Sequence, residues 1–216
     1  FILSCIFVWK ILVYTLDMKI GVGLTVATYN IQHFENEDKI CANIKQLIKN
    51  GCDIICLQEC NHREGFPKAK MLIDALLPQG WSVEYFYDAK FGKVQGFATL
   101  WNNRLIHKNT QTLFLPENKK TDILRYVYTT TPSRRGALLT TLTYQGKAIC
   151  VTNVHLDVKG GMGHRLNQLR YLKEYIAKDI RQYEVICGDF NTIGLPYFAQ
   201  IQKRNIQNIL GGDFVN

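Results

Sequence analysis

The sequence predicts a layered α/β fold that forms one globular domain. Short β-rich runs alternate with helical runs from Leu24 onward, which is the pattern of layered α/β proteins. The chain also has the material for a sizeable core, because 47% of its 216 residues are hydrophobic. Several apolar runs end in polar side chains, as strands of α/β sheets do where they face a ligand.

The first predicted elements are a strand, a helix and a second strand. Residues 24–28 (LTVAT) form a β-rich run, and DIICLQE reads as a buried strand that ends in Gln58 and Glu59. The helix between them has Asn36 as its candidate N-cap and Gly51 at its end. Its inward face is predicted to consist of Ile40, Ile44, Leu47 and Ile48.

The middle of the chain predicts a second helix and two pairs of strands. Residues 68–77 are expected to be helical, and the aromatic-rich residues 81–101 are expected to hold two strands around a glycine-containing loop at 92–96. The runs GALLTTLTY and KAICVTNVHL predict a hairpin that turns at Gln145 and Gly146, since glycine allows the positive φ of a tight turn.

An amphipathic helix and a buried strand complete the pattern. The helix is expected over residues 163–180, and its inward side chains are Leu166, Leu169, Leu172, Ile176 and Ile180. The strand is the run EVIC, which breaks at Gly188 into Asp189, Phe190 and Asn191.

Four apolar strands end in side chains of one chemical family. These are Asn30, Glu59, the series Asn153, His155 and Asp157, and the pair Asp189 and Asn191. Each alone is more often a turn residue or a hydrogen-bonded core group, because Asp and Asn bond the nearby backbone. If the strand ends meet at one edge, the repetition predicts a site.

Carboxylates and amides without a Cys–His cluster suit a hard divalent ion such as Mg²⁺, and Glu59 is the best candidate ligand. Asn30, Asn153 and Asn191 can donate to phosphate oxygens, and Arg134 or Arg135 can add a charge-assisted contact. His155 can bond a phosphate oxygen or pass a proton, and Asp189 can orient a water or act as a base. The predicted reaction is metal-assisted hydrolysis of a phosphate ester.

The order and spacing of these motifs resemble the endonuclease/exonuclease/phosphatase superfamily, between about Leu24 and Asn191. The motifs are TVATYNI, DIICLQE, SRRGALLTTL, CVTNVHLD, RLNQLRYL and ICGDFNT. The resemblance implies a DNase I-like four-layer α/β sandwich, with two mixed β-sheets packed face to face and helices outside.

The resemblance also implies roles for the predicted site residues. Glu59 would be the principal Mg²⁺ ligand, with Mn²⁺ as an alternative ion, and Asn30 would assist it. Asn191 and His155 would contact the scissile phosphate, and Asp189 would orient the nucleophile. Arg135 matches the family position beside Arg134, and Gln168 stands where members often carry a glutamine.

The ends of the sequence depart from that family. Members carry a Ser-Asp-His motif on a last strand, and no such motif is present before Asn216. The sequence is therefore expected to be a C-terminally incomplete fragment with low or absent turnover. Residues 1–17 are a hydrophobic leader, read either as translation upstream of a start at Met18 or as a membrane anchor; residues 18–216 are the domain.

Net charge and cysteine content indicate the class of binding partner and the cellular compartment. The formal net charge of +8 favours polyanions, either nucleic acid or a phospholipid or inositol phosphate. Seven cysteines, several within apolar runs, indicate a reducing compartment, so a cytoplasmic monomer is expected, or a membrane-anchored one if the leader is genuine. The alternative function is a non-catalytic relative that binds a phosphate ligand.

Overall fold

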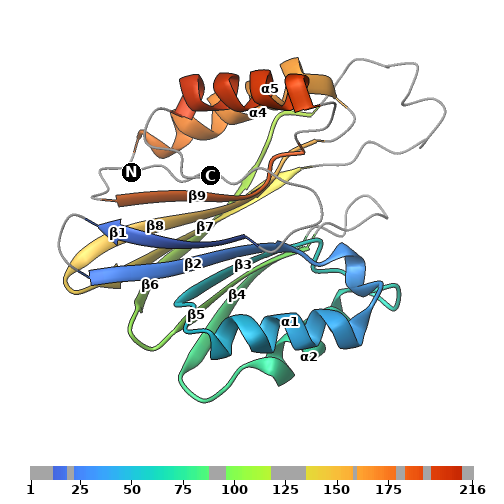
Figure 1. Cartoon of the computed structure of the whole chain (residues 1–216), viewed down its shortest axis with the longest axis vertical. Helices are drawn as coiled ribbons and strands as arrows, with labels where there is room; N and C mark the ends of the chain where they lie inside the picture. Colours follow the sequence, from blue (N-terminus) through green and yellow to red (C-terminus); the bar gives the residue numbers. More distant parts are fainter. Residues whose placement is uncertain are drawn as a thin grey trace.

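Two β-sheets pack face to face in this protein, and helices cover the outer face of each sheet (Figure 1). The computed structural model describes residues 12–18, 22–87, 96–117, 135–157, 160–178, 183–191 and 196–210. The predicted four-layer α/β sandwich of two mixed sheets is therefore confirmed.

The first sheet has five strands in the order β1-β2-β3-β5-β4. β2 and β3 run parallel, and the other neighbours are antiparallel. The strands are β1 (Leu12–Met18), β2 (Val22–Asn30), β3 (Ile54–Gln58), β4 (Trp81–Tyr87) and β5 (Gly96–Asn102).

The second sheet has four strands in the order β6-β7-β8-β9. β8 and β9 run parallel, whereas the other two pairs are antiparallel. The strands are β6 (Ile106–Phe114), β7 (Gly136–Tyr144), β8 (Lys147–His155) and β9 (Tyr183–Asp189). Each sheet thus contains one parallel pair, and both pairs contribute to the site.

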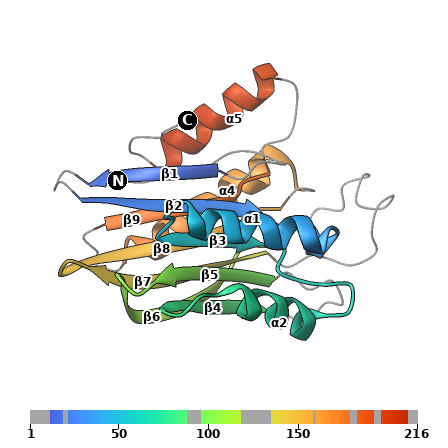
Figure 2. The same cartoon turned by 60° about the horizontal axis from the view of Figure 1, so that its bottom comes forward.

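The helices form the two outer layers, which Figure 2 shows from a second direction. α1 (Glu37–Lys49) and α2 (Phe66–Leu76) bury apolar side chains against the first sheet. α4 (Gly161–Ile176) and α5 (Pro196–Leu210) do so against the second sheet. A short turn of 3-10 helix, η1 (Gln32–Phe34), directly follows β2. No helix in these described ranges is long and apolar enough to cross a membrane.

The space between the sheets is apolar at one end and polar at the other. Leu24, Val26, Val151 and Val185 belong to the apolar part. Burying such side chains is the main stabilising contribution to a fold of this kind. The polar side chains Gln58, His155 and Asp189 gather toward the C-terminal ends of the parallel strands, where the candidate site lies.

Several local predictions are confirmed. Asn36 caps α1, because its Oδ1 accepts the backbone N–H of Lys39 at 3.1 Å. The hairpin of β7 and β8 turns at Gln145 and Gly146, whose φ values of 47° and 75° are both positive, as a tight hairpin turn requires. Leu169, Leu172 and Ile176 of α4 are buried as predicted.

Three elements of the structure were not predicted from the sequence. β6 and α5 were not expected, and β1 falls on the predicted leader, so that the predicted boundary after residue 17 lies inside a strand paired with β2. The predicted loop at residues 92–95 and the inward position of Ile180 lie outside the described residues.

Candidate active site

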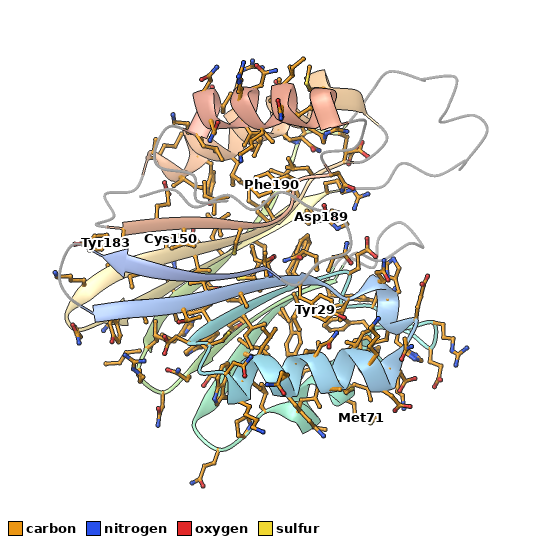
Figure 3. All side chains as sticks on the ribbon, viewed as in Figure 1. Tyr29, Met71, Cys150, Tyr183, Asp189 and Phe190 are labelled. Atoms are coloured by element: carbon orange, nitrogen blue, oxygen red, sulfur yellow. The ribbon has the colours of Figure 1, made fainter. Side chains whose placement is uncertain are left out.

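The C-terminal ends of four strands, two from each sheet, meet at one edge of the molecule. In the first sheet Asn30 pairs with Gln58, and in the second His155 pairs with Asp189. The two sheets join directly here, because Asn30 Nδ2 donates to Asp189 Oδ2 at 2.9 Å. Figure 3 labels Asp189 at this edge. The predicted convergence of polar strand ends is therefore present.

Gly188 lets β9 approach β8 closely just before the site. Its φ is +140°, and a Cβ there would collide with the backbone oxygen of Val154. A residue with a side chain cannot satisfy both demands without moving one strand. The break at Gly188 therefore brings the next residue, Asp189, to the level of His155.

Asp189 is buried and both of its carboxylate oxygens are held. Oδ2 accepts from Asn30, and Oδ1 accepts the backbone N–H of Asn191 at 2.8 Å. Asn191 has a positive φ of 49°, and its Nδ2 donates to the backbone oxygen of Leu156 at 2.7 Å. Phe190 packs into the core beneath α4 and α5.

Glu59 extends beyond the end of β3 and also has a positive φ, of 57°. Its side chain is 21% exposed, and its two oxygens face different imidazoles. Oε1 lies 3.8 Å from His155 Nε2, and Oε2 lies 3.3 Å from His33 Nε2. A non-glycine residue held at positive φ is a mark of functional sites.

His155 is a buried, neutral imidazole. Its Nε2 lies 3.7 Å from Asp189 Oδ2 and 3.2 Å from an Nη of Arg135, which points a donor at it. Burial lowers the pKa of His155 well below its usual value, and the charges of Arg135 and His33 lower it further. His155 Nδ1 is buried without a hydrogen-bond partner.

Arg135 brings a buried positive charge to this cluster. Burial lowers its pKa, and the carboxylates of Asp157, Glu59 and Asp189 oppose that shift. Its Nε is also buried without a partner. Arg134 lies outside the described residues, so Arg135 is the arginine that the structure places here.

A second tier of polar side chains supports the loop after β8. Gln168 of α4 accepts the backbone N–H of Asp157 at 3.0 Å and donates to the backbone oxygen of Pro116 at 3.0 Å. Arg165, one turn earlier on α4, donates to Gln202 of α5 at 3.1 Å. Gln168 thus fixes the backbone beside the site rather than facing the strand ends.

Asn153 is not brought to the edge where the other candidates meet. It is fully buried between the sheets, and its Nδ2 donates to the backbone oxygens of Leu57 and Ala98, each at 3.0 Å. Its Oδ1 accepts from Gln58. Both amide hydrogens of Asn153 are therefore occupied. In this geometry Asn153 joins the two sheets and has no amide hydrogen to donate to a phosphate.

His33 is a neighbour of the site that the sequence patterns did not single out. It lies three residues after Asn30 and has no apolar or polar periodicity to mark it. The only available signal was its closeness to a predicted strand end. Its placement depends on the left-handed backbone of η1, which the sequence does not indicate.

The donors at this edge fit a hard divalent cation. Glu59 offers carboxylate oxygen and Asn30 amide oxygen, and no thiol is in the set. Within the described ranges, no three His, Cys, Asp or Glu side chains already stand together as a complete metal site. Magnesium sites commonly use one or two protein ligands and fill the rest with water and substrate phosphate.

The two-sheet α/β sandwich brings acids, amides, a buried arginine and a histidine to one edge, and this set of side chains suits a phosphate ligand. The family comparison agrees, because residues 27–203 match the model of the Endonuclease/Exonuclease/phosphatase family. The chain belongs to this family, whose members are phosphoesterase hydrolases. A search of curated proteins finds no match to the sequence.

Solved structures share this fold at low sequence identity. Humanized D. rerio TDP2 has a TM-score of 0.57 and 16% identity, covering 82% of this chain and 69% of that one. The human Nocturnin catalytic domain with bound sulfate has a TM-score of 0.57 and 21% identity, covering 82% of this chain and 68% of that one. ANGEL2, a 2',3'-cyclic phosphatase in complex with adenosine-2',3'-vanadate, has a TM-score of 0.59 and 21% identity, covering 91% of this chain and 61% of that one. The match thus spans about two thirds of these chains.

Proposed function

We propose that this protein is a metal-dependent phosphoesterase that cleaves a phosphate ester by attack of water. The observation that carries the proposal is the meeting of Asn30, Glu59, His155 and Asp189 at one edge. They come from four strands of two sheets, and Arg135 lies beside them. A shared fold alone would not require these side chain types together.

Asp189 orients the attacking water and accepts its proton. Its carboxylate is fixed from two sides by Asn30 and Asn191, so its direction does not depend on substrate. A base that is already oriented lowers the entropic barrier to reaction.

Arg135 and His155 bind the phosphate. The guanidinium is buried, where a charge-assisted hydrogen bond to a phosphate oxygen is stronger than in water. When the phosphate takes the Arg135 donor, the Nε2–H tautomer of the neutral His155 imidazole can donate to a phosphate oxygen without adding a second charge, because burial and Arg135 keep its pKa low. Asn191 lies next to Asp189 and completes the phosphate contacts with the amide hydrogen that Leu156 does not use.

Glu59, assisted by Asn30, would hold Mg²⁺ or Mn²⁺. When bound, such an ion neutralises charge that develops on the phosphate oxygens. Two fixed acids near the phosphate, Glu59 and Asp189, would otherwise repel a polyanionic substrate. The residues therefore fit a cation at Glu59.

A nucleotide phosphate is the first substrate class to test. The printed descriptions of TDP2 with single-strand DNA product and of ANGEL2 with adenosine-2',3'-vanadate both name nucleic acid chemistry. The net charge of +8 supports a polyanion but suits phospholipid and inositol phosphates equally. None of the six cysteines within the described residues forms a disulfide, which supports a reducing compartment such as the cytoplasm.

The test is hydrolysis of a chromogenic phosphodiester and phosphomonoester, bis(p-nitrophenyl) phosphate and p-nitrophenyl phosphate. A low rate of turnover is expected with Mg²⁺ or Mn²⁺, and it is lost with a chelator. Glu59→Gln and Asp189→Asn are each expected to reduce kcat by about 10² or more. Glu174→Gln, at an exposed acid on α4, is the matched control and keeps the wild-type rate.

Two results would overturn the proposal. One is wild-type turnover that Glu59→Gln and Asp189→Asn leave unchanged. The other is binding of inorganic phosphate by the folded protein with no turnover of either ester or of a short oligonucleotide. That second result identifies the non-catalytic phosphate-binding relative instead.

A further inference from the structure

The turn that follows β2 holds three non-glycine residues in a left-handed backbone. Gln32, His33 and Phe34 have φ values of 48°, 54° and 59°. A residue with a Cβ is disfavoured in this region, because the Cβ comes too close to the following carbonyl oxygen. Such strain persists only where surrounding contacts impose it, and it clusters at functional sites.

The contacts that impose the turn come from the site itself. Asn30 Oδ1 accepts the backbone N–H of Gln32 at 3.0 Å, and the backbone oxygen of Glu59 accepts that of His33 at 3.2 Å. The buried ring of Phe34 anchors the end of the turn. The two proposed metal-binding residues, Asn30 and Glu59, therefore also fix the position of His33.

The result of this turn is an imidazole beside the Glu59 carboxylate. His33 Nε2 lies 3.3 Å from Glu59 Oε2, and the His33 side chain is 47% exposed. Two ligands bound at about 2.1 Å and at right angles to each other lie about 3.0 Å apart. One ion could thus take both atoms as neighbouring ligands after a small adjustment.

We infer that His33 is a second protein ligand beside Glu59, and that its nitrogen makes the site select a transition-metal ion over Mg²⁺. This inference rests on the proposed function, since it assumes a divalent ion at Glu59. Imidazole binds ions such as Fe²⁺, Co²⁺ and Zn²⁺ well, whereas Mg²⁺ prefers oxygen ligands. A Glu59–His33 pair therefore offers Mg²⁺ one favourable ligand and a transition metal two.

The experiment is calorimetric titration of the full chain with Co²⁺ and separately with Mg²⁺, together with the visible spectrum of the Co²⁺ form. His33→Asn and His33→Gly are the test variants, because Asn and Gly both tolerate positive φ and keep the turn. His107→Gln, an exposed histidine of β6 that bonds Thr110, is the matched control.

Both His33 variants are expected to weaken Co²⁺ binding by at least about tenfold, to change the Co²⁺ spectrum, and to alter Mg²⁺ binding less than about threefold. His107→Gln changes none of these. If either His33 variant weakens both ions equally, or leaves Co²⁺ binding and its spectrum unchanged, the inference is wrong.

Glu59→Gln separates this inference from the proposed function. Loss of binding of both ions in Glu59→Gln, with no selective effect in the His33 variants, refutes only the role of His33. If Glu59→Gln binds both ions as the wild type does, Glu59 is not a metal ligand. That result would refute the metal site and the metal dependence of the proposed reaction.

Discussion

Gln58 Nε2 donates to Asn153 Oδ1 at 2.7 Å, and this bond joins the two sheets directly beneath the strand ends that carry the site. Gln58 also donates to Thr28 Oγ1 at 3.0 Å, and Asn153 donates to two backbone oxygens of the first sheet. The network is fully buried. If one partner is removed, the other keeps a polar atom with no hydrogen bond to protein or to water, which costs stability.

Removing either member of this pair is expected to destabilise the protein. Gln58→Ala and Asn153→Ala should each lower the free energy of unfolding by about 2–3 kcal/mol, as measured by urea denaturation. The double variant should show a coupling energy of at least about 0.5 kcal/mol. Asn109→Ala, at an exposed position of β6, should change stability by less than about 0.5 kcal/mol. Strict additivity would contradict a direct bond.

Gly188→Ala is expected to be among the most damaging single-methyl changes in the chain. The added Cβ meets the backbone oxygen of Val154, and φ is +140°. A loss of more than about 3 kcal/mol of unfolding free energy is expected. Gly163→Ala is the control, since its Cβ meets nothing within 4 Å. Because Gly163 lies inside α4, it should be neutral or stabilising by up to about 1 kcal/mol. Equal effects of the two would refute the steric argument.

The buried neutral His155 is expected to make stability fall on the acid side. Its pKa in the folded protein is well below the ordinary 6.5, so below pH 6.5 the unfolded chain binds a proton that the folded protein does not. The free energy of unfolding should therefore decrease as pH falls from about 6.5. Urea denaturation between pH 7 and 5 should show a smaller slope in His155→Gln and His155→Asn, by up to about 1.4 kcal/mol per pH unit. Parallel curves would show that His155 is not the group responsible.

Asp53 is expected to stabilise the fold without serving the site. It is buried just before β3 begins, and it accepts from the Thr25 N–H at 2.9 Å, Asn102 Nδ2 at 2.8 Å and Arg104 at 2.8 Å. Asp53→Ala should cost about 3 kcal/mol by urea denaturation, because these donors lose their acceptor. Lys70→Ala, which removes an exposed pair with Asp74, should cost less than about 1 kcal/mol. A changed kcat per folded molecule in Asp53→Ala would contradict its distance from the site.

Local chemistry made much of this fold predictable from the sequence. The cap at Asn36 and the turn at Gln145 and Gly146 depend only on nearby residues, so short patterns sufficed. The strand ends were also predictable, because apolar runs stop where polar side chains begin. β1 was missed because its composition is shared by buried strands and hydrophobic leaders, and β6 was missed because its exposed run HKNTQT lacks alternation.

The parts of the site that escaped prediction depend on long-range geometry. Asn153 and His155 share a face of β8, but Asn153 lies one repeat, roughly 7 Å, further from the edge. How far β8 projects past the first sheet decides which of them reaches the site, and no local pattern encodes that projection. His33 escaped for a related reason, since its left-handed backbone is imposed by Glu59 from another strand.

The hydrogen bond between Asn30 and Asp189 spans 159 positions of the chain. Contacts this distant form late in folding, because the intervening chain must first lose its freedom. A chain leaving the ribosome exposes Asn30 and Glu59 long before Asp189 exists, so no partly made copy can assemble the cluster of strand-end side chains. The cluster cannot form until both sheets have docked, and a ligand that requires it would report on completed folding rather than on secondary structure.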